Sequence, residues 1–280
     1  MRSTLRALVA LSSLSQACSF RVLLIRHAQS QNNVIAADIA QRMAGRPAAE
    51  MRAAFEELRH FDPALSEAGE QQAGLLAEYL ADKFIARDTP VYCSTMRRTI
   101  LTSRPVVHLL GWKGNVREDL FEVGGSYTTR DGEEMVHPGT PPRELAQEFA
   151  EYSLSSELAA LGDQGWYQAD HRETKAEAVD RARRVSQWLW DLAEASGGRP
   201  AQDVDVACVL HGDLLALLLR ALLEIPEESA TTFLHLNTGT TLLDLDVKRQ
   251  RCTLLWHNQV EHLAGHPGVV TGDEMLRVVS

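Results

Sequence analysis

From residue 22 to residue 33 the chain reads Val-Leu-Leu-Ile-Arg-His-Ala-Gln-Ser-Gln-Asn-Asn. The four consecutive apolar residues, two of them β-branched, predict a strand that is buried on both faces. The run ends at Arg26 and His27, and the polar residues that follow predict a loop. Because open α/β sheets bind ligands outside the carboxyl ends of their strands, we expect a binding site at this point of the chain.

Arg26 and His27 carry side chains that suit phosphate chemistry. A neutral imidazole is a nucleophile, and neighbouring cations disfavour its protonated form. The same cations bind clusters of anionic oxygens, of which phosphate is the commonest biological case. Taken alone, the dipeptide is better explained by an arginine in a surface ion pair and a buried structural histidine. The assignment therefore depends on the rest of the chain.

The segment from Arg26 to Asn33 resembles the Arg-His-Gly-x-Ser-x-x-Asn signature of the histidine phosphatase (phosphoglycerate mutase-like) superfamily, branch 1. Further segments resemble motifs of this family in the same order: Asp62-Pro63-Ala64-Leu65-Ser66-Glu67-Ala68-Gly69 with Gln72-Ala73, the stretch Ser94 to Ser103, Leu120-Phe121-Glu122, Leu210-His211-Gly212, Asn237-Thr238-Gly239-Thr240, Asn258, and His262-Leu263. The series spans most of residues 20–263, and an ordered series of this kind is a specific signal.

The resemblance implies an α/β fold, a three-layer α/β/α sandwich with a mostly parallel central sheet. It also implies that His27 attacks phosphorus and forms a phosphohistidine, which water then hydrolyses. Arg26, Arg98 and His211 would bind the equatorial oxygens of the phosphoryl group, and Asn33 would add an amide hydrogen bond. Stabilising the charge on a transferring phosphoryl group is the largest contribution that a protein can make to this reaction.

The leaving alkoxide needs a proton, and two carboxyl groups could supply it. Glu122 matches the general acid of the family, and it would need a raised pKa to hold a proton near neutral pH. Asp213 is the rival, because a related branch places an aspartate just after its second histidine. Asp213 could instead be a helix N-terminal residue that the helix dipole favours. We favour Glu122.

Ala28 departs from the family pattern, which most often has glycine at this position. Glycine permits a close backbone approach and unusual φ angles, and alanine is the smallest alternative. We therefore expect a slightly tighter pocket that keeps its activity.

The composition restricts the partners of this chain of 280 residues. A formal net charge of -10 argues against nucleic acid or an anionic membrane surface as the main partner, so a phosphate site must be a local cationic island. The expected partner is a small phosphorylated substrate, with a phosphoprotein as an alternative, and the oligomeric state stays open. No apolar run reaches the length of about 18 residues that a membrane-spanning helix needs.

Neither the cysteines nor the histidines show the spacing of a metal site. Cys18, Cys93, Cys208 and Cys252 form no Cys-x-x-Cys pair, and Cys93 and Cys208 lie in apolar runs that predict buried free thiols. The histidines beyond His27 and His211 are scattered. We therefore predict neither a metal nor another cofactor.

Residues 1–20 are rich in Leu, Ala and Ser, contain Arg2 and Arg6, and have no acidic residue. They resemble a transit or short signal peptide, and a disordered tail explains them equally well. We expect an intracellular, cytoplasmic protein, or an organellar one if this segment is a targeting signal. Residues 21–280 are predicted to form one domain with insertions at about 34–60 and 124–165.

Hydrophobic patterning predicts the remaining elements. The stretch 34–60 reads as two helices broken near Gly45-Arg46-Pro47, which either cover the pocket and select substrate or form an ordinary solvated insertion. Residues 124–165 read as a mostly irregular insertion with one helix after a proline-rich segment. Further helices are predicted for about 67–86, 214–223 and a stretch that Thr174 and Glu177 cap. Further strands are predicted at 91–93, 204–210, 240–247 and 252–257, the last two as a hairpin.

Three functions compete. The first is a metal-independent phosphatase that hydrolyses phosphate monoesters. The second is a phosphoglycerate mutase-type phosphotransferase; because mutases carry more cationic pocket residues and residues 34–60 contain no lysine, hydrolysis is favoured. The third is a catalytically weak regulatory or binding member of the same fold. Retention of Arg26, His27, Arg98, Glu122 and His211 argues against it.

Overall fold

The computed structural model describes residues 19–83, 89–111, 113–197 and 204–272. The strands within these ranges are β1 (Ser19–Arg26), β2 (Val91–Ser94), β3 (Gly114–Arg117), β4 (Tyr127–Arg130), β5 (Glu133–Val136), β6 (Tyr152–Leu154), β7 (Val206–Leu210), β8 (Thr240–Asp246) and β9 (Arg251–Gln259). The α-helices are α1 (Gln31–Arg42), α2 (Ala48–Leu58), α3 (Glu67–Lys83), α4 (Arg97–Leu110), α5 (Pro142–Glu148), α6 (Ser156–Ala160), α7 (Lys175–Ala195) and α8 (Gly212–Leu222). The predicted targeting segment or tail lies outside the described residues, except for its last two positions, which belong to β1.

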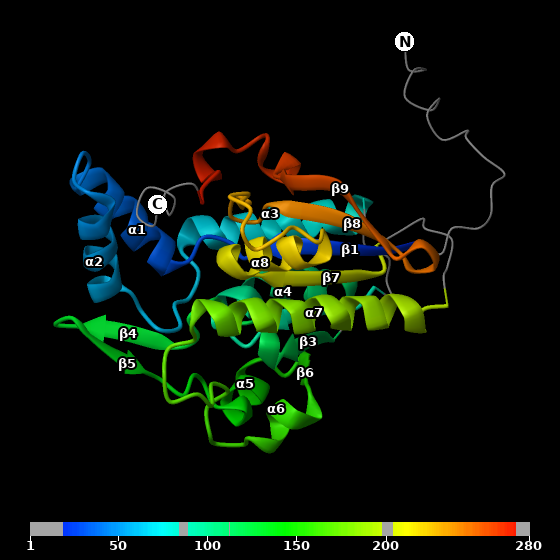
Figure 1. Ribbon diagram of the computed structural model, residues 1–280, viewed down its shortest axis with the longest axis horizontal. Coiled ribbons are helices and arrows are strands. Elements are labelled where there is room, and N and C mark those ends of the chain that lie inside the picture. The colour runs from blue at the N-terminus through cyan, green and yellow to red at the C-terminus, as the bar shows by residue number, and fades with distance from the viewer. Residues whose placement is uncertain (1–18, 84–88, 112, 198–203, 273–280) are drawn as a thin grey trace, which may run out of the picture.

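The central sheet has seven strands in the order β6-β3-β2-β7-β1-β8-β9 (Figure 1). The first five of these are parallel to one another. Strand β8 is antiparallel to β1 and to β9, with which it forms the predicted hairpin. Arg26 at the end of β1 is level with Leu210 at the end of β7. Because β2 runs parallel to β7, its end also lies at this edge, so the residues after β1, β2 and β7 meet there.

Helices cover both faces of the sheet, as Figure 1 shows, with α7 and α8 in front and α3 and α4 behind. Strand β1 explains the layering, because its side chains alternate between the two faces. Leu23 and Ile25 join the core under α3 and α4, whereas Val22 and Leu24 join the core under α7 and α8. The predicted three-layer α/β/α sandwich with a mostly parallel sheet is confirmed.

The first insertion forms two helices, α1 and α2, and the break between them falls at the predicted place, with Gly45 at a φ of 84°. The loop predicted after His27 is wrong in its second half, since α1 begins at Gln31. Ser30 caps this helix, and Asn33 completes a capping box with it. A Ser-x-x-Asn spacing before a helix was the signal for this start.

The second insertion is more regular than predicted. It begins with the hairpin β4–β5 and continues through α5 to β6, which joins the central sheet beside β3. Residues 152–154 are therefore part of the core architecture. Strand β3 itself was not predicted, because Gly114-Asn115-Val116-Arg117 is short and carries one apolar side chain.

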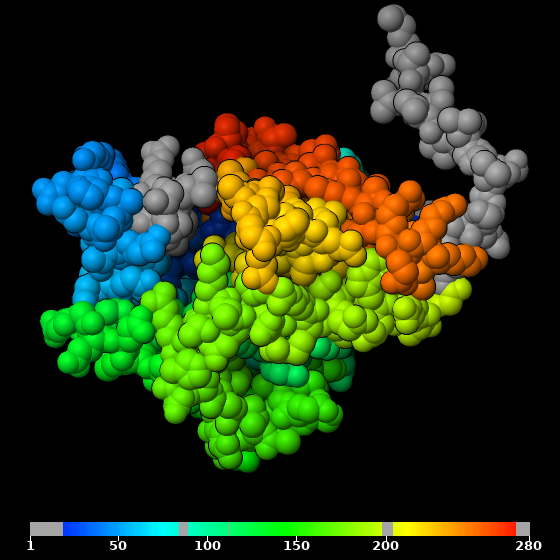
Figure 2. Space-filling model, in the orientation of Figure 1, coloured from blue at the N-terminus to red at the C-terminus, as the bar shows by residue number. Residues whose placement is uncertain are grey.

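The two insertions contact each other. Glu57 of α2 accepts hydrogen bonds from the backbone N–H groups of Asp131 and Gly132, at 2.9 and 2.8 Å, in the turn between β4 and β5. Arg130 donates in return to the Glu57 carbonyl oxygen at 2.8 Å. In Figure 2 the light-blue α2 and the green hairpin meet at the left of the molecule.

Cys93 and Cys208 are buried free thiols, as predicted, and Cys18 lies outside the described residues. Within the described ranges, no helix combines the length and the apolar character that crossing a membrane requires.

Candidate active site

His27 follows β1 directly, and its backbone is fixed on several sides. Its N–H donates to the Leu210 carbonyl oxygen at 2.9 Å, and its own carbonyl oxygen accepts from Asn237 Nδ2 at 3.0 Å. Two residues farther on, the Gln29 N–H donates to Gln72 Oε1 at 2.7 Å. The motifs around Gln72 and Asn237 thus support the backbone that presents His27.

The hydrogen bonds of the His27 ring decide its tautomer. Nδ1 lies 2.7 Å from the Ala28 carbonyl oxygen, which can only accept, so Nδ1 carries the proton. In the neutral ring Nε2 then has a lone pair, and Arg98 Nε donates to it at 3.3 Å. Burial, followed by the charges of Arg98 and Arg26, holds the pKa of His27 well below its ordinary value. His27 is therefore a neutral imidazole with a nucleophilic Nε2.

The ring of His211 contacts the ring of His27, with centroids 5.3 Å apart and planes at 60°. It precedes α8 at the end of β7 and is fully buried, with Nε2 3.0 Å from Ser94 Oγ. Its Nδ1 has no hydrogen-bond partner among the described residues. Burial and then the Arg98 charge lower the pKa of His211, so it too is neutral before an anion arrives.

Arg98 lies in the first turn of α4, where the helix has no side-chain cap of its own. Asp62 supplies one from a distant segment, because its Oδ1 accepts the Arg97 N–H at 3.0 Å. The Arg98 side chain is buried, and although burial lowers its pKa to about 10 it stays charged at neutral pH. Arg97 points elsewhere and pairs with Glu148 at the surface, with Nη1 2.6 Å from Oε2.

Two backbone carbonyl groups orient Arg26. Its Nη1 donates to the carbonyl oxygens of His235 and Gly272, the latter at 3.0 Å. Asn33 is more constrained than predicted, because its Oδ1 accepts from the N–H and the hydroxyl of Ser30, both at 2.9 Å. The side-chain N–H groups of Asn33 are thus the part suited to an anion, as a phosphate-binding role requires.

Ala28 does not make the pocket tighter, contrary to the expectation. Its side chain packs with Leu65 and Ala73, away from the cavity lining, and its φ is not positive. The Cβ that distinguishes it from glycine therefore fills the core beneath the loop.

Glu122 lies at the N-terminus of α8. Its Oε1 accepts the N–H groups of Val123 and Leu214 at 2.9 and 3.1 Å, and its Oε2 accepts the Asp213 N–H at 3.4 Å. Burial and the neighbouring Asp213 raise its pKa to about 7, against the opposing effect of Arg98. Burial also raises the pKa of Asp213. The two carboxyl groups therefore titrate as a coupled pair.

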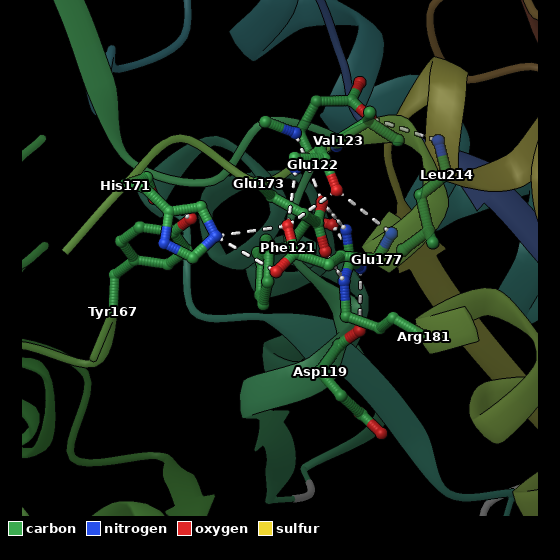
Figure 3. A network of polar contacts seen from close by, with 12 residues as sticks. Asp119, Phe121, Glu122, Val123, Tyr167, His171, Glu173, Glu177, Arg181 and Leu214 are labelled. Atoms are coloured by element: carbon green, nitrogen blue, oxygen red, sulfur yellow. Dashed lines mark hydrogen bonds and ion pairs between the residues drawn. The ribbon is translucent and has the colours of Figure 1, made fainter. Parts of the chain in front are cut away.

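An ion pair of Arg181 and Glu173 holds the segment that carries Glu122 (Figure 3). Arg181 Nη1 donates to the carbonyl oxygens of Asp119 and Phe121, at 3.0 and 2.8 Å, and its guanidinium stacks on the Phe121 ring at 3.7 Å. Glu173 Oε2 accepts the Gly124 N–H at 3.2 Å. The backbone is thus fixed on both sides of Glu122. The sequence analysis missed this pair, since its members lie in separate segments and no motif marks them.

A cavity of about 570 Å³ opens above these groups. Its lining includes most of the predicted site residues together with the rival acid: Arg26, His27, Asn33, Arg98, Glu122 and Asp213. His211 is adjacent through His27 but is not part of the lining. The lining also contains residues that the sequence did not assign to the site, from both insertions, from the segment before α7 and from its first residue: Arg52, Phe55, Glu56, Arg59, Tyr127, Arg172 and Lys175. In the sequence, the arginines of the insertions follow no motif that would have marked them as site residues.

The arrangement joins a neutral imidazole nucleophile, two buried guanidinium groups and a carboxyl group that is protonated near neutral pH. Such a set can bind a tetrahedral oxyanion, attack its central atom and protonate a leaving oxygen. Among the described residues, no cluster of three or more His, Cys, Asp or Glu side chains has the arrangement of a metal site.

Comparisons with known proteins agree with this geometry. A family model described as histidine phosphatase superfamily (branch 1) matches residues 22–259. Comparison with curated protein sequences gave no match. A structure titled Mycobacterial hydrolase 1 superposes with a TM-score of 0.52 at 22% identity, over 86% of this chain and 99% of that chain.

Two further solved structures are similar to the same extent. A mycobacterial glucosyl-3-phosphoglycerate phosphatase has a TM-score of 0.52 at 21% identity, over 86% of this chain and 100% of that chain. The alpha-ribazole phosphatase from Shigella flexneri has a TM-score of 0.51 at 23% identity, over 86% of this chain and 96% of that chain. At these identities the similarity shows a shared fold.

Proposed function

The chain belongs to the histidine phosphatase superfamily, branch 1, and from that premise we propose that it is a metal-independent phosphatase that hydrolyses phosphate monoesters through a phosphohistidine. The observation that carries the proposal is the tautomer of His27. With Nδ1–H donated to Ala28, the lone pair of Nε2 is available for attack, and Arg98 beside it can bind the phosphoryl oxygens.

In the first step His27 Nε2 forms a bond to phosphorus while the ester P–O bond breaks. The leaving alkoxide takes the proton of Glu122. Oε1 accepts two N–H groups, whereas Oε2 accepts only the longer bond of 3.4 Å from Asp213, so Oε2 is the oxygen that carries this proton. In the second step water attacks phosphorus, the N–P bond breaks and Glu122 takes a proton back from the water. Phosphate then leaves.

The charges of Arg26 and Arg98 stabilise the phosphoryl group throughout, in the role that a divalent ion has in metal-dependent phosphatases. His211 would add a hydrogen bond and Asn33 a further one. Both guanidinium groups are already buried and oriented in the structure, so little reorganisation is needed at the moment of reaction.

One observation favours the phosphoglycerate mutase-type alternative. Hydrolysis was favoured from the sequence because residues 34–60 contain only scattered arginines and no lysine, yet the folded pocket collects Arg52, Arg59, Arg172 and Lys175 above the site. The number of cationic pocket residues therefore no longer favours hydrolysis over the mutase reaction. A direct assay must separate the two reactions.

The test is release of inorganic phosphate from p-nitrophenyl phosphate and a panel of alkyl phosphates, in EDTA, beside an assay of 2- and 3-phosphoglycerate interconversion. We expect phosphate release that EDTA does not change, and acid-labile phosphohistidine in protein quenched during turnover. His27→Ala should lose both signals. Release that disappears in EDTA, fast interconversion with negligible release, or an active His27→Ala variant would each contradict the proposal.

A further inference from the structure

We call the lining residues from the two insertions and from the segment that leads into α7 the outer wall of the cavity: Arg52, Phe55, Glu56, Arg59, Tyr127, Arg172 and Lys175. Tyr127 on β4 lies between two guanidinium groups in this outer wall. The Cζ atoms of Arg59 and Arg172 are each 3.9 Å from the centroid of its ring. Its hydroxyl donates to Glu56 Oε1 at 3.0 Å. The ring is 3% exposed, so it holds both arginines against a rigid surface and limits their rotamers.

One carboxylate serves both arginines. Glu56 Oε1 lies 3.4 Å from Arg172 Nη2, and Glu56 Oε2 lies 3.6 Å from Arg59 Nη1. Arg172 has a second partner in Glu134 at 2.6 Å, outside the cavity lining. The other carboxylate of the outer lining, Glu173, is occupied by its bidentate pair with Arg181.

Arg59 is the most unusual of these groups, because it is 9% exposed and yet its guanidinium makes no hydrogen bond to a described residue. Buried polar groups are generally hydrogen-bonded, and a guanidinium offers five donors. The Nε of Arg59 is buried without a partner, while the residue contributes to the cavity lining. Its donors are therefore arranged for an acceptor that enters the cavity.

Lys175 adds a further charge at the cavity mouth. It is the first residue of α7, where the positive end of the helix dipole disfavours a cation. Its side chain is exposed and has no ion-pair partner in the described part of the chain. The capping box of Thr174 and Glu177 already satisfies the start of α7, so an anion that enters the cavity would pair with the ammonium group itself.

The size and charge of the cavity agree with a second anion. A volume of about 570 Å³ exceeds what a phosphoryl group needs and lies in the range of about 300–1,000 Å³ typical of small-molecule sites. The Arg59 charge also reaches the inner site, since it contributes to lowering the pKa of Arg98. The described lining carries six cationic side chains against four carboxyl groups, so in a chain of net charge -10 the cavity is a local cationic site that attracts anions.

We propose that the substrate is a small phosphate monoester with a second anionic group, a carboxylate or a second phosphate, and that Arg59, Arg172 and Lys175 bind that group. This inference rests on the proposed phosphatase function. On this proposal, residues at the strand ends carry out the reaction, whereas residues of the insertions and around the start of α7 select the substrate.

The experiment compares three series of esters of graded chain length: n-alkyl phosphates, ω-carboxyalkyl phosphates and α,ω-alkanediol bisphosphates. For the wild type we expect kcat/KM to be about 100-fold higher for the best ester with a second anionic group than for the alkyl phosphate of equal length, because that group pairs buried donors. The carboxylate and bisphosphate series then show which anion the subsite prefers. Equal kcat/KM across the three series would overturn the proposal.

Two variants test the residues. Arg59→Gln and Lys175→Gln should each reduce the ratio of kcat/KM between the esters with a second anionic group and the alkyl phosphates by about tenfold or more. Arg143→Gln and Lys248→Gln are the matched controls, since both side chains are exposed and lie outside the cavity, and they should keep the ratio. If Arg59→Gln does not fold, the exposed Lys175 decides. An unchanged ratio in folded Lys175→Gln and Arg59→Gln overturns the assignment.

Failure of the phosphatase proposal gives a different result. In that case no ester, p-nitrophenyl phosphate included, releases phosphate. Calorimetric binding of the same esters to the wild type then tests the subsite alone. Tighter binding of the esters with a second anionic group supports the subsite, and equal binding of all the esters overturns it.

Discussion

Arg181 and Glu173 form a bidentate ion pair, with Nε 2.7 Å from Oε1 and side chains that are 3% and 6% exposed. Removing one partner of such a pair leaves an uncompensated buried charge, at a cost of about 3–5 kcal/mol. This pair has a second effect, because the remaining Arg181 donors bind the backbone on the N-terminal side of Glu122. Arg181 is thus placed to act on catalysis through Glu122 without touching the substrate.

The first prediction concerns this positioning role. Arg181→Lys keeps the charge but loses the planar fork, so Glu122 should be less well oriented. We expect kcat for alkyl phosphates, whose leaving groups need a proton, to fall about tenfold, and kcat for p-nitrophenyl phosphate to fall about twofold or less. Arg183→Lys, an exposed substitution on the same helix, should change neither. Equal losses on both substrates would show a merely structural role.

The second prediction identifies the general acid. Glu122→Gln cannot donate a proton, and it should slow alkyl phosphates by about 100-fold or more while affecting p-nitrophenyl phosphate much less. At a pH low enough to keep Glu122 protonated in both proteins, Asp213→Asn should show little dependence on the leaving group, because the Asp213 carboxyl group only adds to the effect of burial in raising the pKa of Glu122. If Asp213→Asn shows the strong dependence and Glu122→Gln does not, the two roles are exchanged.

The third prediction is a pH dependence. With a pKa of about 7, Glu122 of the free enzyme is protonated below that pH, so kcat/KM for alkyl phosphates should fall as the pH rises above about 7. Asp213→Asn removes a nearby negative charge and should shift this limb to lower pH. A profile that stays flat from pH 6 to about pH 9 for poor leaving groups would contradict the assignment.

The same pKa predicts a change in stability. Between the ordinary value of 4.5 and about 7 the folded state binds more protons at Glu122 than the unfolded state does. The contribution of Glu122 to the free energy of unfolding must therefore decrease as the pH rises through this window. Above pH 7, Glu122→Gln should be more stable than the wild type by roughly 1 kcal/mol or more, measured by urea unfolding. An equally stable or less stable variant would count against the raised pKa.

The fifth prediction concerns Gly69 on α3. A Cβ atom there would lie 2.0 Å from the Gln29 carbonyl oxygen, on the loop that carries His27. Gly69→Ala should therefore destabilise the protein by about 2 kcal/mol or more and reduce kcat. Gly74→Ala on the same helix has open space and should be neutral or stabilising by up to about 1 kcal/mol. Similar stability of the two variants would show that the backbones are not in firm contact.

The sequence was most informative where one local pattern determines the structure. Val22 to Ile25 and the apolar run ending at Leu210 could be assigned because buried parallel strands are continuously apolar. Thr174 and Glu177 form the predicted capping box. Short elements were missed, since β3 and β6 have too few residues to show a period and form through pairing with other strands.

The inner and outer parts of the site differ in the same way. The positions of Arg26, His27, Arg98 and His211 followed from motifs at strand ends, and that of Glu122 from the motif Leu120-Phe121-Glu122. The structure brings these residues together, while their roles stay predictions. The outer wall could not be foreseen. It depends on Tyr127 packing between arginines from other segments, and no local pattern encodes such a contact.

The hydrogen bonds between Glu57 and the β4–β5 turn have a consequence for the evolution of substrate specificity. A substitution in α2 alters the support of the hairpin, and a substitution in the hairpin alters the support of Arg59. The two insertions should therefore be inherited and exchanged as one block. In a chimera that receives only one of them from a relative, the catalytic residues at the strand ends would remain. The hydrogen bonds between α2 and the β4–β5 turn, which hold the outer wall together, would be lost.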